Sequence, residues 1–328
     1  MIQDNVQTLD RFQGCLLGAA IGDALGMPAE SMTQTEILLA TKGQGITDFI
    51  APIQTKIPEL RKLMAGRTTD DWQLTHAVAR SLIRCEEFDI YDQALSHVDA
   101  YHDSTVGWGG TTKKSIEELH WYFGDYGTDG RRPTQKPVLR GAGNGVAMKI
   151  APIALAGHGK QRISLDQQVK NLAWLTHSHP AAISGALVVA DLIFLYTNIN
   201  FHDIKINWLL RKNVKDKTFE KLELLAENFD RCMNEPIEYA VALLGNRCVA
   251  YESVPLAIAI AFRNQDNFEQ GVIEAVNAGG DTDTIGSMVG AILGAKLGVG
   301  AIPDRWLNFS EVERAMKLAT NLHQTFKT

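Results

Sequence analysis

The stretch that decides the fold lies near the end of the chain, where residues 278–286 read Ala-Gly-Gly-Asp-Thr-Asp-Thr-Ile-Gly. A Gly-Gly turn here precedes two carboxylates and two hydroxyls, and a run of small apolar residues follows at once. This order predicts a loop that brings oxygen atoms to the start of a buried helix. Taken alone, the same residues would suit a simple helix N-cap, since Asp and Thr accept hydrogen bonds from free backbone N–H groups.

A second acidic stretch, Thr69-Asp70-Asp71, argues for more than a cap. Apolar residues repeat at helical spacing from Leu74 to Leu82, so a helix is expected to begin at these aspartates. Two adjacent aspartates exceed what one N-cap needs, and their mutual repulsion calls for a cation. Because only oxygen ligands are offered, the sequence favours a hard cation such as Mg²⁺.

The N-terminal region predicts a central helix that ends at Gly26, because Pro28 lacks an N–H group and fixes φ. Three of its glycines stand four residues apart: Gly14, Gly18 and Gly22. This spacing places them on one face, which lets another backbone approach closely. Asp23 lies among small apolar neighbours, so its charge must find a partner or stay at the helix end.

Most of the remaining chain also repeats apolar residues with helical period, and no alternating strand pattern or hairpin signal is found. Further helices are expected at residues 113–123, 181–196, 256–262 and 268–277. Residues 31–66, with scattered Gly and Pro, predict an irregular surface excursion. No repeat, low-complexity tract or Pro/Ser-rich linker divides the chain, so we predict one all-α domain spanning residues 1–328.

Composition limits the class of protein. Hydrophobic residues make up 45% of the 328 residues and charged residues 21%, as in an ordinary globular protein. A net charge of -6 argues against nucleic acid as a partner. The four cysteines stand far apart and the N-terminus lacks a signal peptide, so we expect a cytoplasmic protein. The apolar segment Ile285–Ile302 carries Lys296 and five glycines, which favours a buried helix over a membrane span.

Two glycine-containing segments and a histidine pair are weaker candidates for a site. Residues 107–110 and 141–145 each lead into an expected helix. The second segment could present N–H groups to a phosphate, although a plain turn is an equal interpretation. His177 and His179 stand beside Pro180 without a neighbouring carboxylate, so we expect a helix junction there and assign no zinc site.

Together these segments resemble the ADP-ribosylglycohydrolases, a family that includes the hydrolase reactivating dinitrogenase reductase. The matching segments run from about residue 11 to residue 307 and are residues 14–26, 69–71, 107–109, 143–148, 175–177 and 279–284. The resemblance implies an all-α domain with two Mg²⁺ ions, or Mn²⁺ in some members, in a cleft that binds ADP-ribose. Trp72 departs from the Thr that commonly follows the two aspartates in this family.

The resemblance also implies roles for individual residues. The metal ligands would be Glu30, Thr69, Asp70, Asp71, Asp281, Asp283 and Thr284. Asp283 would bridge the ions, and Glu30 would also gate the site. The substrate-binding residues would be Gly109, Gly143, Asn144, Gly145 and His177, with the 143–145 loop holding the diphosphate.

The implied activity is removal of ADP-ribose from a modified protein side chain, with arginine the favoured acceptor. Glu30, Asp70 and Asp283 are the catalytic candidates, and Glu30 or Asp70 would take a proton from the attacking water. Two alternatives stay open: a metal-dependent hydrolase of a free nucleotide or ribosyl compound, and a non-catalytic scaffold of the same fold. We expect a monomer that acts on ADP-ribosylated protein, with neither nucleic acid nor membrane as partner.

Overall fold

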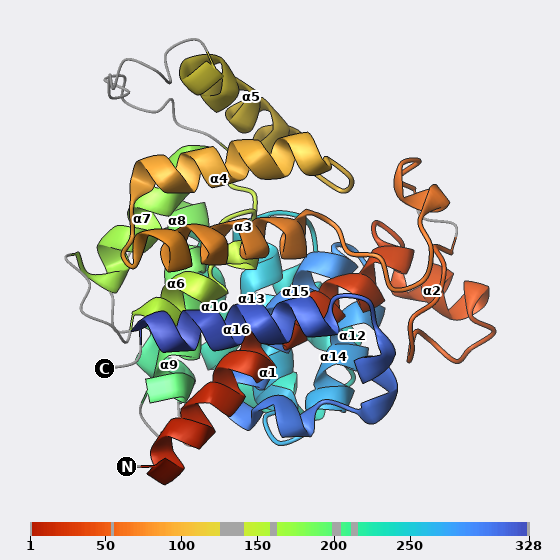
Figure 1. Cartoon of the computed structure of the whole chain (residues 1–328). Coiled ribbons are helices and arrows are strands. Elements are labelled where there is room, and N and C mark those ends of the chain that lie inside the picture. The colour runs from red at the N-terminus through yellow and green to blue at the C-terminus, as the bar shows by residue number, and fades with distance from the viewer. Residues whose placement is uncertain are drawn as a thin grey trace.

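The computed structural model describes residues 2–53, 56–124, 141–157, 163–198, 205–210 and 216–326. Regular secondary structure in these residues is helical, and an isolated bridge joins Gly143 to Val249. The α-helices (Figure 1) are α1 (Ile2–Gly26), α2 (Gln34–Ala40), α3 (Asp70–Cys85), α4 (Ile90–Asp103), α5 (Gly110–Gly124), α6 (Ala151–Ala156), α7 (Leu165–Thr176), α8 (Pro180–Asn198), α9 (Ile206–Leu209), α10 (Lys217–Glu227), α11 (Phe229–Asn234), α12 (Ile237–Leu244), α13 (Ala250–Arg263), α14 (Phe268–Asn277), α15 (Thr282–Leu297) and α16 (Val312–Phe326). The predicted all-α fold is confirmed.

Helices α1 and α15 form the centre of the molecule and run antiparallel. Their glycines face one another so closely that a Cβ atom on Gly18 would lie 2.2 Å from the carbonyl oxygen of Gly290. A Cβ atom on Gly22 would lie 2.0 Å from the carbonyl oxygen of Gly286. The two backbones therefore touch directly, as the four-residue glycine spacing predicts. This pairing brings the end of α1 next to the start of α15.

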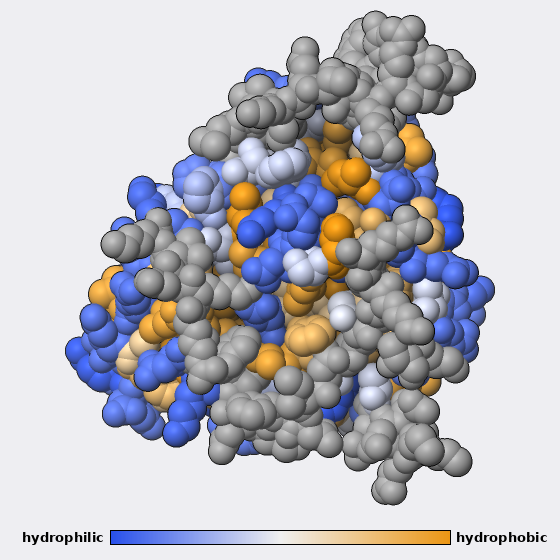
Figure 2. All heavy atoms as spheres, turned by 90° about the vertical axis from the view of Figure 1, so that its left-hand side faces the viewer, coloured by the Kyte–Doolittle hydropathy of each residue, from blue (hydrophilic) through white to orange (hydrophobic). Residues whose placement is uncertain are grey.

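The other helices surround this pair. In Figure 1, α16 crosses α1, α4 and α5 lie beyond α3 at one end, and α2 projects on another side. Within the described chain, one helix, α8, is long and apolar enough to span a membrane by length and composition. Its window Pro180–Thr197 is 78% buried against neighbouring helices, as in a core helix. Hydrophobic and hydrophilic side chains are interspersed on the face drawn in Figure 2.

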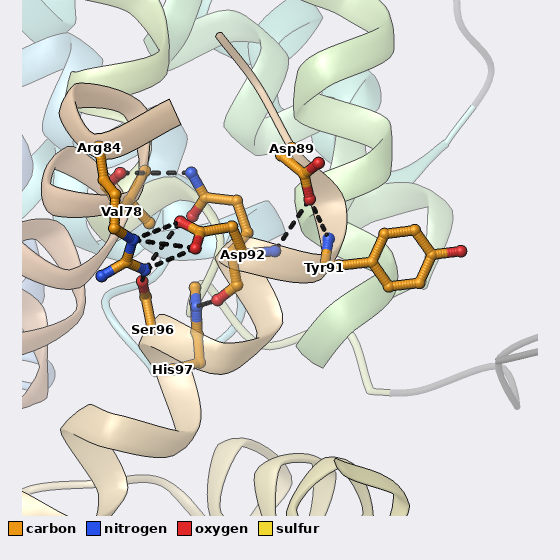
Figure 3. A network of polar contacts seen from close by, with 8 residues as sticks. Val78, Arg84, Asp89, Tyr91, Asp92, Ser96 and His97 are labelled. Carbon is orange, nitrogen blue, oxygen red and sulfur yellow. Dashed lines mark hydrogen bonds and ion pairs between the residues drawn. The ribbon is translucent and has the colours of Figure 1, made fainter. Parts of the chain in front are cut away.

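Polar contacts fix α4 against α3 (Figure 3). Arg84 near the end of α3 donates from Nη2 to Asp92 Oδ2 at 2.8 Å and to Ser96 Oγ at 2.9 Å. The Gln93 amide donates to the carbonyl oxygen of Val78 at 3.2 Å. These bonds tie one side of α4 to α3, the helix that begins at the paired aspartates.

The region 31–66 contains a helix that the sequence interpretation did not predict. Helix α2 begins with a capping box, in which Thr33 Oγ1 accepts from the N–H of Glu36 and Glu36 accepts from the N–H of Thr33 at 2.7 Å. Such a box can start a short helix even where glycine and proline stand close by. The expected helices at 113–123, 181–196 and 268–277 are present as α5, α8 and α14. The helix expected at 256–262 begins earlier, at Ala250, whose N–H donates to the carbonyl oxygen of Ala142.

A candidate metal centre where three helix ends meet

The candidate site lies where the ends of three helices come together. Asp23 lies in the last turn of α1, Thr69–Asp71 form the start of α3, and Asp281–Thr284 form the start of α15. Glu30 directly follows the short 3-10 helix Met27–Ala29 after α1. The N-terminal ends of α3 and α15 carry partial positive charge, which offsets a part of the repulsion among these carboxylates.

One half of the centre contains three aspartates. Oxygen atoms of Asp23, Asp71 and Asp283 all lie within 4.8 Å of one another, and all three residues are buried. Thr69 Oγ1 donates to Asp23 Oδ1 at 2.8 Å, and Thr284 Oγ1 donates to Asp71 Oδ2 at 3.3 Å. The second oxygen of Asp71, Oδ1, is buried and has no hydrogen-bond partner among the described residues. A buried, unpartnered carboxylate oxygen beside like charges fits a cation with hard oxygen ligands.

The other half combines Glu30 and Asp281 with a cysteine. Ligand atoms of Glu30, Cys248 and Asp281 also lie within 4.8 Å of one another. Glu30 forms a side-chain hydrogen bond with Asp283, so the two halves adjoin. Asp70 is 6% exposed and accepts a hydrogen bond from the N–H of Gly109. The structure thus brings together every residue predicted as a metal ligand.

Burial dominates the electrostatics of these carboxyl groups. It raises the pKa of Asp70 to about 8 and that of Glu30 to about 9, and the neighbouring negative charges add to both shifts. The pKa values of Asp71 and Asp283 are raised well above the usual range, again chiefly by burial. Without a cation such groups would hold protons near neutral pH, so a cation and protons compete for the same oxygens.

The residues predicted to bind substrate lie beside the centre. A Cβ atom on Gly143 would lie 2.9 Å from His177 Nε2, and one on Gly145 would lie 2.5 Å from His177 Cε1. The imidazole therefore rests against a backbone that has no side chains at these two positions. Asn144 donates to Ser253 Oγ at 2.9 Å and also to Asp281 Oδ2, which links the loop to the carboxylates.

A buried lysine helps to place His177. Lys149 is fully buried, and its Nζ donates to Thr176 Oγ1 at 3.1 Å, while Ser115 Oγ donates to the Thr176 carbonyl. These bonds fix the end of α7, from which His177 follows. Burial lowers the pKa of Lys149 to about 7, against the opposite effect of Asp70. His179 accepts from the N–H of Ala181 at 3.1 Å, so it acts at the helix junction, as expected.

Two members of the centre were missed as site residues. Asp23 was expected only to need a partner, and it accepts hydrogen bonds from the N–H groups of Thr69 and Trp72 at 3.0 Å. It therefore caps α3 from a different helix. Cys248 had no sequence signal, because the spacing of the cysteines suggested isolated thiols. Trp72 is 1% exposed and donates from Nε1 to Glu311 Oε2 at 2.9 Å, away from the carboxylates that it follows in sequence.

Comparisons with known proteins identify the family of this chain. The sequence profile of the family described as ADP-ribosylglycohydrolase matches residues 4–328. An uncharacterized protein of Archaeoglobus fulgidus is 32% identical, with 96% of each chain covered. The ADP-ribosylhydrolase ARH3 of Homo sapiens is 27% identical, covering 98% of this chain and 95% of that protein. The ADP-ribosyl-[dinitrogen reductase] glycohydrolase of Rhodospirillum rubrum is 29% identical, covering 91% of this chain and 90% of that protein.

A solved structure also matches. It is a chain described as an ADP-ribosylglycohydrolase-related protein complex, with a TM-score of 0.69, 26% identity, and coverage of 98% of this chain and 99% of that chain. The profile match covers nearly the whole length of the chain, and the matching structure shares its helical fold. The chain therefore belongs to the ADP-ribosylglycohydrolase family.

Proposed function

We propose that this protein is an ADP-ribosylhydrolase that depends on two divalent cations and releases ADP-ribose from a modified protein side chain. The observation that carries the proposal is the pair of adjoining ligand clusters, Asp23–Asp71–Asp283 and Glu30–Cys248–Asp281. Their buried carboxyl groups lie beside the glycine loop and His177, which the family resemblance assigns to ADP-ribose. Membership of the ADP-ribosylglycohydrolase family supports the reaction class.

The cation ligands are proposed to be Glu30, Thr69, Asp70, Asp71, Asp281, Asp283 and Thr284, with Mg²⁺ as the cation and Mn²⁺ as a substitute. When bound, such cations supply positive charge that can orient ribose hydroxyls and acidify a water molecule. Asp283 is the proposed bridging ligand, because the structure places it against residues of both clusters.

The chain's own groups would orient the substrate and move the proton. Asp70 and Glu30 are the candidate bases, since each is a carboxylate at the centre that a cation would keep ionised. The N–H of Gly109 holds the Asp70 carboxylate in place. Gly143, Asn144 and Gly145 would approach the diphosphate with their backbone, and His177 behind them would contact the ligand.

Arginine is the acceptor that we propose first, in a cytoplasmic monomer. The Rhodospirillum rubrum relative carries the name of a hydrolase acting on an ADP-ribosylated protein, which supports a protein substrate. A free nucleotide or ribosyl compound is the second candidate, because the site residues specify the ribose and phosphate end of the ligand rather than the leaving group.

The test incubates the protein with arginine-ADP-ribosylated and serine-ADP-ribosylated proteins, with Mg²⁺ or with chelator, and follows free ADP-ribose. Release from the arginine substrate alone, abolished by chelator, is the expected result. Release from the serine substrate alone would keep the hydrolase and change the acceptor. If neither substrate releases ADP-ribose although calorimetry shows Mg²⁺ binding, the side-chain hydrolase is wrong, and nucleotide substrates or the scaffold alternative take its place.

A further inference from the structure

One end of the metal centre offers sulfur, whereas the other offers only oxygen. We propose that Cys248 Sγ, together with the carboxylates of Glu30 and Asp281, forms a site for a borderline or soft divalent cation such as Zn²⁺. The inference rests on the proposed cation centre and adds a cation preference that the oxygen ligands alone would not give.

Backbone contacts on both sides of Cys248 place its sulfur. The carbonyl oxygen of Asn246 accepts from the N–H of Asp281 at 2.9 Å, which ties the cysteine loop directly to the loop that starts α15. After the cysteine, Val249 forms the bridge with Gly143, so the far side of the loop is also held. The position of the thiol beside Asp281 is thus set by the fold.

An ion pair between exposed Arg247 and buried Glu252 also holds this loop. Glu252, in the first turn of α13, accepts from the backbone N–H of Arg247 at 3.2 Å and from its Nε at 2.9 Å. Glu252 is 7% exposed, whereas Cys248 is exposed and therefore open to a cation from solution. The sulfur is both fixed and reachable.

The donor set decides which cation this end prefers. Ligand atoms from three separate segments, within 4.8 Å of one another, match the spacing needed around one ion. Thiolate selects Zn²⁺ and similar ions, whereas Mg²⁺ takes oxygen ligands and gains nothing from sulfur. On binding, the Sγ–H proton leaves to solvent as the bond from sulfur to the cation forms.

A second observation supports a cation in the cluster that adjoins this thiol. The adjoining cluster holds the buried Asp71 Oδ1, which has no hydrogen-bond partner among the described residues. Glu30 connects the two clusters through its hydrogen bond to Asp283. Among the described residues, no other cysteine belongs to a group of this kind.

The experiment titrates the metal-free full chain with Co²⁺, whose thiolate charge-transfer band in the near ultraviolet reports a bond to sulfur. The variants are Cys248→Ser and Cys248→Ala, and Cys85→Ser is the matched control, because Cys85 is partly exposed and lies away from the centre. We expect the band in the unaltered chain and in Cys85→Ser and its absence in both Cys248 variants. Calorimetry should show Zn²⁺ affinity reduced at least about tenfold in these variants, since even loss of an outer partner of a ligand costs that much. Mg²⁺ affinity should change far less.

A band that persists in Cys248→Ser, or no band in the unaltered chain at saturating Co²⁺, would overturn the inference. Should the variants fail to fold by circular dichroism, the unaltered chain still decides. Zn²⁺ added to the Co²⁺-loaded unaltered chain should then displace the charge-transfer band, and a band that Zn²⁺ does not displace contradicts the site. ADP-ribose release with Mg²⁺ is measured separately, so hydrolysis without the band refutes only the thiol site.

Discussion

The two ends of helix α3 hold charged side chains in opposite ways. At its start, Asp70 and Asp71 are buried beside Asp23 and Asp283, and every one of these groups has a raised pKa. At its end, Arg84 is 44% exposed and forms a bidentate ion pair with Asp92. Burial alone would raise the pKa of Asp92, yet the hydrogen bonds from Arg84 lower it.

The comparison distinguishes a charged pair that is neutralised within the chain from carboxylates that have no such neutralising partner. The Arg84–Asp92 pair is complete within the chain, and such partly exposed pairs contribute at most about 1 kcal/mol. The carboxylates at the start of α3 instead cost stability when ionised without a cation, because burial and mutual repulsion add up. Binding of a cation to these carboxylates would offset this loss of stability.

The largest effect should follow from removing one carboxylate of the group at the start of α3, which is called the acidic end below. Asp283→Asn keeps the size of the side chain and an acceptor for the N–H of Thr284, so the helix start should persist. We expect loss of Mg²⁺ binding and a fall in ADP-ribose release of more than about 100-fold, since even outer partners of metal ligands reach that value. Asp92→Asn is the matched control and should keep activity, because Asp92 lies in α4 beside the other end of α3. Full activity in Asp283→Asn would mean that the centre is misassigned.

The next effect concerns the helix pair that positions the acidic end. Gly22→Ala would place a Cβ atom 2.0 Å from the carbonyl oxygen of Gly286. The backbones must separate, so we expect a loss of about 1–3 kcal/mol in the free energy of unfolding, measured by urea denaturation. Gly300→Ala is the control, because its added Cβ would meet nothing within 4 Å. Equal stability of the two variants would contradict direct backbone contact between α1 and α15.

A smaller effect is the pH dependence of the stabilisation by Mg²⁺, which should arise at the acidic end of α3. The folded-state pKa values of Asp23, Asp70 and Glu30, raised to about 7, 8 and 9, lie above their unfolded values near 4. Between these limits the metal-free folded state binds more protons than the unfolded state, so its stability falls as pH rises. Mg²⁺ replaces those protons, and the gain in Tm on adding Mg²⁺ should therefore grow from about pH 5 to about pH 8.

The measurement compares Tm with Mg²⁺ and with chelator across this range. Groups with shifts of the opposite sign, such as Lys149 and His76, titrate in both samples and largely cancel in the difference. A gain in Tm that stays constant with pH would show that the carboxylates do not exchange protons for the cation.

The smallest effect should come from removing the Arg84–Asp92 ion pair at the end of α3. Arg84→Met removes the ion pair with Asp92 and the bond to Ser96 but keeps a long side chain. We expect a loss of at most about 1 kcal/mol in unfolding free energy and unchanged Mg²⁺ affinity by calorimetry. A marked loss of Mg²⁺ affinity would instead show that α4 holds the acidic end in place through α3.

Features that depend on a local sequence pattern could be predicted, whereas features that depend on contacts between distant segments could not. The four-residue glycine spacing of α1 is a local pattern, and it predicted the close approach of another backbone. The aspartates at the starts of α3 and α15 are also local patterns, and each predicted the start of a helix. Asp23 was recognised as needing a partner, but that partner is the start of α3. Helix α2 had a usable signal in Thr33 and Glu36, which glycine and proline nearby obscured.

Cys248 shows where sequence interpretation ends. No spacing of cysteine, histidine or carboxylate residues leads to it, because contacts between distant segments, such as the bond between Asn246 and Asp281, bring its loop to the centre. The roles of Gly109, Gly143, Asn144, Gly145 and His177 stay predictions from family resemblance, although the structure places them beside the carboxylates.

The close pairing of α1 with α15 has a consequence for biosynthesis. Thr282 Oγ1 donates to the carbonyl oxygen of Gly26 at 2.8 Å across 256 residues of chain. The glycine face of α1 must therefore stay bare until α15 has been translated, because its partner glycines lie on that helix. Contacts of such long range make folding slow and expose nascent chains to aggregation. Assembly of the candidate metal centre is thus a late event, because its carboxylates at the start of α15 are translated long after those of α1 and α3.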